Sequence, residues 1–247
     1  MDGIEYFYEL YTGLPRGGPG DNHSTRKAFS YLKNLPSEPL ILDIGCGPGM
    51  QTLELAKISK GKIIALDNHQ PFLDTLMKQA TNIGFEKKII PKNLSMFEMD
   101  FKDACFDVIW SEGALYQMGF QNGLKKCYQL LKKTGYLAVT EGVILTSDAP
   151  AEAKRFWDEY PDVKDIQTNI NLIKQEHFEL IAHFTLPTAS WTEQYYAPME
   201  KKLHELKKKY KGNTTALQVF AMSENEIETY KKNSDYVGYE FFIMQKV

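Results

Sequence analysis

The segment that most constrains the fold runs from Asp43 to Gly49 and reads DIGCGPG, directly after the apolar residues 40–42. Its three glycines let the backbone turn sharply and let a ligand approach where a Cβ would otherwise intrude. A buried strand, a glycine-rich turn and a helix in this order form a site for a nucleotide-like ligand at the carboxyl edge of a parallel sheet. The segment therefore predicts an α/β fold with a ligand site at this turn.

Apolar runs typical of buried strands alternate with helical patterns through the first part of the chain. Strands are expected at 40–43, 63–67, 89–90, 106–110 and 136–140. Five strands that alternate with helices imply a doubly wound parallel sheet with right-handed crossovers, covered on both faces. Pro91 cannot donate a hydrogen bond to a neighbouring strand, so the third strand is expected at a sheet edge.

The later part of the chain has a different pattern. We expect a helix capped by Ser24, helical structure over 151–176 with a break at Pro161, and a helix over 198–210 with the basic face Lys207–Lys209. The pair Ser223 and Glu226 has the spacing of a capping box, which predicts a further helix start. Strands are expected at 178–184 and 239–244. The basic run is typical of a solvated helix face.

Residues 1–23 combine four aromatic side chains with a stretch rich in glycine and proline, residues 14–20. Aromatic side chains need an apolar surface to cover, and the glycines imply a tight or mobile loop. Two interpretations are therefore open for this segment: a short helix packed on the domain, or a lid over the ligand.

Composition excludes several classes of protein. The formal net charge of −3 over 247 residues gives no basic surface for nucleic acid, and no apolar run approaches the length of a membrane span. The three cysteines, Cys46, Cys105 and Cys127, lie far apart and form no pattern of a metal site. No signal peptide is recognisable at the N-terminus, so a cytoplasmic location with reduced thiols is expected.

The ligand class follows from spacing. A dinucleotide fingerprint that starts at Gly45 requires a third glycine at position 50, which is Met50. Asp67 ends the neighbouring strand, where a carboxylate can accept hydrogen bonds from a ribose diol. S-adenosylmethionine has no phosphate but carries a ribose and a positively charged tail, which suits Asp43 at the end of the first strand.

At these residues the sequence resembles the class I S-adenosylmethionine-dependent methyltransferases, most of all the small-molecule enzymes of the quinone-biosynthesis type. The resemblance implies a seven-stranded, mostly parallel sheet with an antiparallel last strand. It also implies that Asp67 binds the ribose and that Ser95 and Met96 bracket the adenine. The expected cofactor-binding residues are Asp43, Gly45, Cys46, Gly47, Gly49, Asp67, Asn68, Ser95, Met96 and Glu112.

The catalytic candidates are Glu112 after the fourth strand, Tyr116 beyond it, and Glu141 at the end of the fifth strand. Either carboxylate could act as a general base or hold a cationic acceptor, and either could be purely structural. Trp191, with the tyrosines at 195 and 196, forms an aromatic cluster that could line an acceptor pocket or belong to the core.

We expect a single domain over residues 1–247, with helical elaborations at about 145–177 and 188–235 and the possibility of a homodimer. Three functions are carried forward: methyl transfer to a small molecule, a nicotinamide-dependent oxidoreductase, and a protein that binds S-adenosylmethionine without turnover. Met50 argues against the second. The absence of an Asn-Pro-Pro-Tyr element and of a basic surface favours a small molecule over nucleic acid.

Overall fold

A mixed sheet forms the centre of the protein in the computed structural model, which describes residues 3–157, 160 and 163–247. Its main strands are β1 (Ile41–Ile44), β2 (Ile63–Asp67), β3 (Ile89–Asn93), β4 (Phe106–Glu112), β5 (Leu131–Ile144), β7 (Phe178–Thr185) and β8 (Val237–Lys246). Their order is β3-β2-β1-β4-β5-β8-β7, and a two-residue strand, β6 (Lys164–Asp165), pairs with the end of β5.

The strand directions match the predicted sheet. Strands β1 to β5 are parallel to one another, and β8 is antiparallel to both of its neighbours, β5 and β7. Strand β3, which contains Pro91, lies at one edge as predicted. The expected seven-stranded, doubly wound fold is confirmed, with β6 as an addition that the sequence did not indicate.

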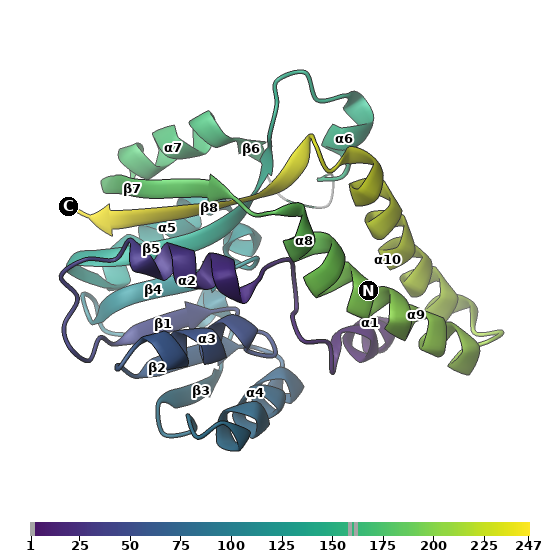
Figure 1. Cartoon of the computed structure of the whole chain (residues 1–247), viewed down its shortest axis with the longest axis horizontal. Coiled ribbons are helices and arrows are strands. Elements are labelled where there is room, and N and C mark those ends of the chain that lie inside the picture. The colour runs from purple at the N-terminus through teal and green to yellow at the C-terminus, as the bar shows by residue number, and fades with distance from the viewer. Residues whose placement is uncertain (1–2, 158–159, 161–162) are drawn as a thin grey trace.

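Helices cover both faces of the sheet (Figure 1). On one face, α2 (Asn22–Ser30), α3 (Met50–Ile58) and α4 (Gln70–Asn82) bury their apolar side chains in the larger core cluster. On the other face, α5 (Phe120–Leu130) and α7 (Ile166–Gln175) bury theirs in the second cluster. Because the sheet is buried on both faces, its central strands are nearly continuous apolar runs.

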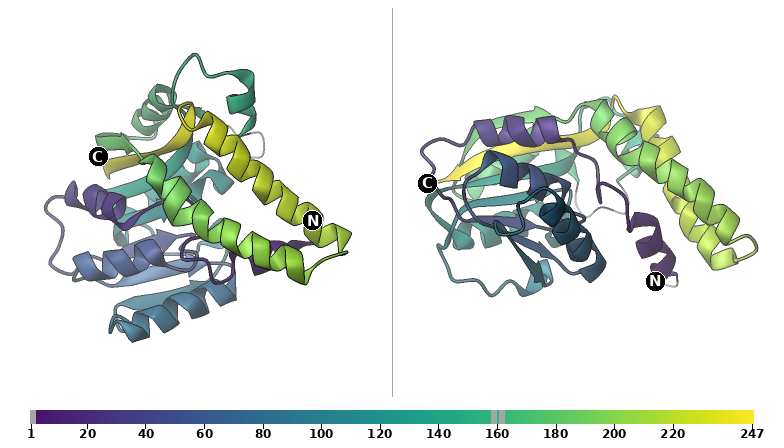
Figure 2. Two further views of the ribbon diagram at one scale, coloured as in Figure 1. Left: turned by 45° about the vertical axis from the view of Figure 1, so that its right-hand side comes forward. Right: turned by 60° about the horizontal axis from the view of Figure 1, so that its bottom comes forward.

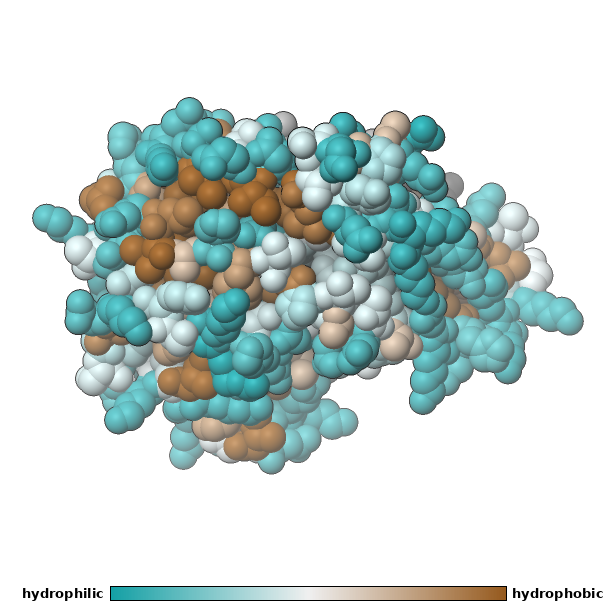
Figure 3. All heavy atoms as spheres, turned by 45° about the horizontal axis from the view of Figure 1, so that its top comes forward, coloured by the Kyte–Doolittle hydropathy of each residue, from teal (hydrophilic) through white to brown (hydrophobic). Residues whose placement is uncertain are grey.

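A helical arm extends from one end of the sheet (Figures 1 and 2). It consists of α8 (Thr188–Trp191), a π-helical turn (Thr192–Tyr196), α9 (Ala197–Lys209) and α10 (Thr214–Asn233). The first helix, α1 (Ile4–Tyr11), packs against α9 and α10, and α6 (Ala151–Arg155) packs against α10. The arm is mostly hydrophilic on the face in Figure 3, and Lys207–Lys209 are exposed as predicted.

Two predicted helix starts are wrong. Asp21, not Ser24, caps α2, because its carboxylate accepts a hydrogen bond from the Ser24 amide at 2.8 Å, and the helix ends at Ser30. Ser223 lies buried inside α10, whose cap is Asn213. A capping-box pattern also occurs by chance within a longer helix. Here the apolar face of α10 continues past Ser223, and the packing of that face, not the capping pattern, determines where the helix begins.

The segment 151–176 is less helical than predicted. It contains α6 and α7 with β6 between them, and the expected break at Pro161 lies outside the described residues. Over the described ranges, no helix combines the length and the apolar character needed to cross a membrane.

Candidate functional site

The glycine turn after β1 is fixed by close packing. Gly45 and Gly49 have φ angles of 68° and 93°, in the left-handed region that favours glycine. A Cβ at position 45 would lie 2.3 Å from the Cβ of Ala114, and one at position 49 would lie 2.2 Å from Leu76. The turn therefore needs glycine at both positions for backbone conformation and for space.

Asp67 connects the end of β2 to this turn. One carboxylate oxygen accepts a hydrogen bond from the Gly47 amide, and the other accepts one from the His69 amide, each at 2.9 Å. Burial raises the pKa of Asp67, while these two amide hydrogen bonds oppose the shift. The carboxylate thus orders both segments at the edge of the site.

A pocket of about 270 Å³ opens beside the turn, at the carboxyl ends of β1, β2 and β4. Eight of the ten residues predicted to bind cofactor line it: Gly45, Cys46, Gly47, Asp67, Asn68, Ser95, Met96 and Glu112. They come from segments that lie far apart in the sequence. The parallel sheet brings them together because it aligns the strand ends at one edge.

Asp43 and Gly49 are placed differently. Neither lines the pocket; Gly49 begins α3, and Asp43 is fully buried beneath the turn. The hydroxyl of Thr52 donates to one carboxylate oxygen of Asp43 at 2.6 Å, and the other oxygen has no hydrogen-bond partner among the described residues. Burial raises the pKa of Asp43 to about 7.

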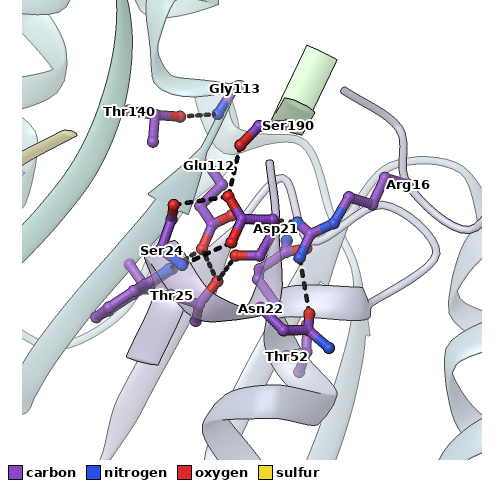
Figure 4. Close-up of polar contacts among 12 residues, drawn as sticks. Arg16, Asp21, Asn22, Ser24, Thr25, Thr52, Glu112, Gly113, Thr140 and Ser190 are labelled. Carbon is purple, nitrogen blue, oxygen red and sulfur yellow. Dashed lines mark hydrogen bonds and ion pairs between the residues drawn. The ribbon is translucent and has the colours of Figure 1, made fainter. Parts of the chain in front are cut away.

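Glu112 lies at the centre of a buried polar cluster (Figure 4). Its carboxylate accepts hydrogen bonds from the Thr25 hydroxyl at 2.7 Å, the Trp110 indole at 2.9 Å and the Arg16 guanidinium at 3.2 Å. Both side chains of the Arg16–Glu112 ion pair are almost fully buried, at 4% and 3% exposure. Asn22 accepts a further hydrogen bond from Arg16 at 2.8 Å.

The N-terminal segment forms one wall of the pocket. Phe7, Tyr8, Tyr11 and residues 16–19 line it, and the ring of Tyr8 stacks on that of His69 with centroids 4.0 Å apart. Sequence reasoning missed Arg16 as a site residue. Its position in the stretch rich in glycine and proline, directly after the aromatic residues, was the signal that could have found it.

Tyr116 and Glu141 do not line this pocket. Tyr116 contacts the ring of Tyr160, with centroids 4.6 Å apart. Glu141 lies opposite Glu240 in the β5–β8 pair and is buried, and one of its oxygens has no hydrogen-bond partner in the part of the chain that the structure describes. Burial raises the pKa of Glu141 to about 8.

Comparison with known proteins shows that part of this chain is similar to methyltransferases. Residues 41–135 match the model of a methyltransferase domain. The chain is 27% identical over 140 residues to a sterol 24-C-methyltransferase of Eremothecium gossypii; the aligned region covers 56% of this chain and 37% of that protein. It is 23% identical over 114 residues to the 27-O-demethylrifamycin SV methyltransferase of Amycolatopsis mediterranei, and this aligned region covers 46% of this chain and 42% of that protein. The chain thus spans less than half the length of these curated relatives.

Among solved structures, a methyltransferase of Thiobacillus denitrificans in complex with S-adenosylhomocysteine has the same fold. The TM-score is 0.86 with 16% identity, and the match covers 100% of both chains. The matched domain includes the glycine turn, Asp67, Ser95 and Glu112. Residues 41–135 therefore resemble a methyltransferase domain, and the chain as a whole has the fold of solved methyltransferases.

Proposed function

We propose that the protein transfers a methyl group from S-adenosylmethionine to a small-molecule acceptor. The observation that carries this proposal is the pocket at the strand ends, where the glycine turn and the Asp67 carboxylate meet. When bound, S-adenosylmethionine supplies an electrophilic methyl group on a sulfonium. The protein's own residues then have to hold both reactants in line and exclude water.

The residues of the pocket fit such a cofactor. Asp67 presents a carboxylate at the end of β2, and Ser95 and Met96 line the same pocket from the segment after β3. The turn brings backbone rather than side chains to the ligand, since a Cβ at Gly45 would meet Ala114. Asp43 lies below the turn with an unpartnered oxygen among the described residues, and we assign it an electrostatic role toward the cofactor's cationic tail.

We further propose that Glu112 positions the N-terminal segment rather than acting as a base. Its two oxygens accept three hydrogen bonds, from Thr25, Trp110 and Arg16, which occupy most of the acceptor sites of the carboxylate. Arg16 in turn lines the pocket. Through this pair, Glu112 holds residues 16–19 against the cofactor site.

The first helix is proposed to close over the bound cofactor. At the pocket, Tyr8 of this helix stacks on His69. Hydrogen bonds tie the helix to the arm: Glu9 accepts from Lys209 and from Tyr210, each at 2.6 Å. A helix held this way can move with the arm when the pocket opens. Hydrogen exchange should slow in residues 4–11 when S-adenosylhomocysteine is added, and equal rates with and without it would contradict a lid.

Methyl transfer is tested by incubating the protein with S-adenosylmethionine carrying a labelled methyl group and a library of small metabolites. Formation of S-adenosylhomocysteine together with a labelled product identifies an enzyme. Binding without any product across the library would support a non-catalytic binding protein. A fluorescence response to NADH, with none to S-adenosylhomocysteine, would instead support the oxidoreductase.

Three properties stay predictions from the sequence: the cytoplasmic location, the homodimer, and the lack of nucleic-acid binding.

A further inference from the structure

A second pocket, of about 350 Å³, is lined by residues of α1, α6 and α10 and by Phe156. Phe7 and Tyr11 of α1 line both pockets, so the two share a wall made of these rings. A molecule held in the second pocket can therefore reach the cofactor site past a single pair of aromatic side chains. Figure 2 shows α1 lying beside the arm at this place.

Aromatic and carboxylate groups meet in this second pocket. Phe7, Tyr11 and Phe156 provide ring surfaces, and the half-buried Glu226 of α10 lies among them. Tyr196, from the π-helical turn, donates a hydrogen bond to the Glu226 carboxylate at 3.0 Å. A carboxylate framed by aromatic faces attracts an organic cation through both its charge and the ring quadrupoles.

The surrounding charges favour the same ligand. Glu152 also lines the pocket, as does Arg155, whose side chain is exposed at the end of α6. The neighbouring tyrosines stay neutral, since burial and the Glu226 charge raise the pKa of Tyr11 and of Tyr196. Among the described residues, the side chains that line the pocket therefore carry one more negative than positive charge.

We propose that this pocket binds an ammonium group of the acceptor, between the rings of Phe7, Tyr11 and Phe156 and the carboxylate of Glu226. This inference rests on the proposed methyl transfer and gives its acceptor a chemical class: a small molecule with a cationic nitrogen at one end. A protonated or quaternary nitrogen has no lone pair to attack a methyl group. The ammonium is thus a recognition group, and the methylated atom lies elsewhere in the acceptor, toward the cofactor pocket.

The test compares two probes of the same shape, choline and 3,3-dimethyl-1-butanol, which differ in charge. Binding is measured by ligand-observed NMR in the presence of S-adenosylhomocysteine. We expect the wild-type protein to bind choline at least about tenfold more tightly than the neutral alcohol. Glu226→Gln should abolish this preference, whereas Glu228→Gln, which removes an exposed charge from the same helix, should retain it.

A second variant guards against loss of folding in Glu226→Gln. Asn225→Lys places a cation at the exposed rim of the pocket while it leaves the Tyr196–Glu226 hydrogen bond in place, and it should also abolish the preference for choline. Equal binding of the two probes to the wild-type protein, or an unchanged preference in folded Glu226→Gln, would overturn the proposal. If the wild-type protein did not bind S-adenosylhomocysteine, that result would instead overturn the proposed function.

Discussion

The guanidinium of Arg16 lies 3.2 Å from the carboxylate of Glu112, although the two residues are 96 positions apart in the chain. Both groups are buried, and each keeps further partners: Asn22 for the arginine, and Thr25 and Trp110 for the glutamate. This contact fixes the N-terminal segment to the end of β4, at the wall of the pocket.

Breaking this pair should destabilise the protein strongly. Arg16→Met leaves a buried carboxylate without its counter-charge, which typically costs about 3–5 kcal/mol. The free energy of unfolding, measured in urea, checks this value. Lys231→Met removes a pair with Glu200 in which both side chains are nearly half exposed, and it should cost less than about 1 kcal/mol. Similar losses of unfolding free energy in the two variants would show that the buried pair contributes no more to stability than the exposed pair.

Asp67→Ala should weaken the binding of S-adenosylhomocysteine by about ten- to a hundredfold. The change removes a charged hydrogen-bond acceptor worth about 1.5–3 kcal/mol, and it also releases the amides of Gly47 and His69. Isothermal titration calorimetry measures the affinity. Asp74→Ala, an exposed change on α4, is the control and should bind like the wild-type protein. Unchanged affinity in folded Asp67→Ala would remove this residue from the site.

Binding of S-adenosylhomocysteine should tighten as the pH rises from about 6 to about 8. Asp43 has a pKa of about 7 in the protein alone, and a nearby cationic amino group would lower it. Below pH 7, Asp43 must therefore lose a proton when the ligand binds, and this weakens the affinity. At pH 8, Asp43 is already charged, so that binding carries no such cost. Calorimetry in two buffers of different ionisation enthalpy detects the released proton. Asp43→Asn should abolish the proton release, and an identical pH dependence in this variant would contradict the electrostatic role.

Glu141 should make stability fall as the pH rises. Its pKa is raised from 4.5 to about 8 in the folded protein, so the folded state holds the proton more tightly than the unfolded chain. The stabilisation present below about pH 4.5 is therefore lost as the pH rises through 8. Glu141→Gln should gain stability relative to the wild-type protein between pH 5 and pH 8, as measured by urea unfolding.

Asp165→Asn is the matched control for this pH experiment. Asp165 caps α7, and the hydrogen bonds from Thr168 lower its pKa below the ordinary value of 3.8. Its charge does not change between pH 5 and pH 8, so its effect on unfolding should be the same at both values. If Glu141→Gln also showed a constant difference, the buried carboxyl would not be the titrating group.

Gly49→Ala should be far more damaging than Gly212→Ala. Both glycines have positive φ, so each alanine pays about 1–2 kcal/mol for the left-handed conformation. At Gly49 the new methyl group would also lie 2.2 Å from Leu76, whereas nothing lies within 4 Å at Gly212. Overpacking of this kind adds about 1–3 kcal/mol, and thermal unfolding of the two variants compares them. Equal losses of stability in the two variants would mean that the turn around Gly49 can accommodate the new methyl group without steric strain.

The sequence alone determined the sheet and the edge of the sheet at which the pocket opens. Period, length and the position of Pro91 predicted five parallel strands with β3 at the edge, because buried strands and glycine turns carry local signals. The spacing of the glycine turn and Asp67 indicated the edge at which the pocket opens. These features depend on residues close together in the chain or on the regular order of the elements.

Only the tertiary structure decided which distant side chains meet. Nothing near Arg16 in the sequence indicates that Glu112 is its buried partner. Likewise, the residues around Ser223 do not indicate that it lies in the interior of α10 and not at a helix start. Asp43 was expected in the pocket, yet the turn folds over it and buries it. Contacts across many residues follow from how helices and strands pack, since packing selects among partners that local sequence leaves equally available.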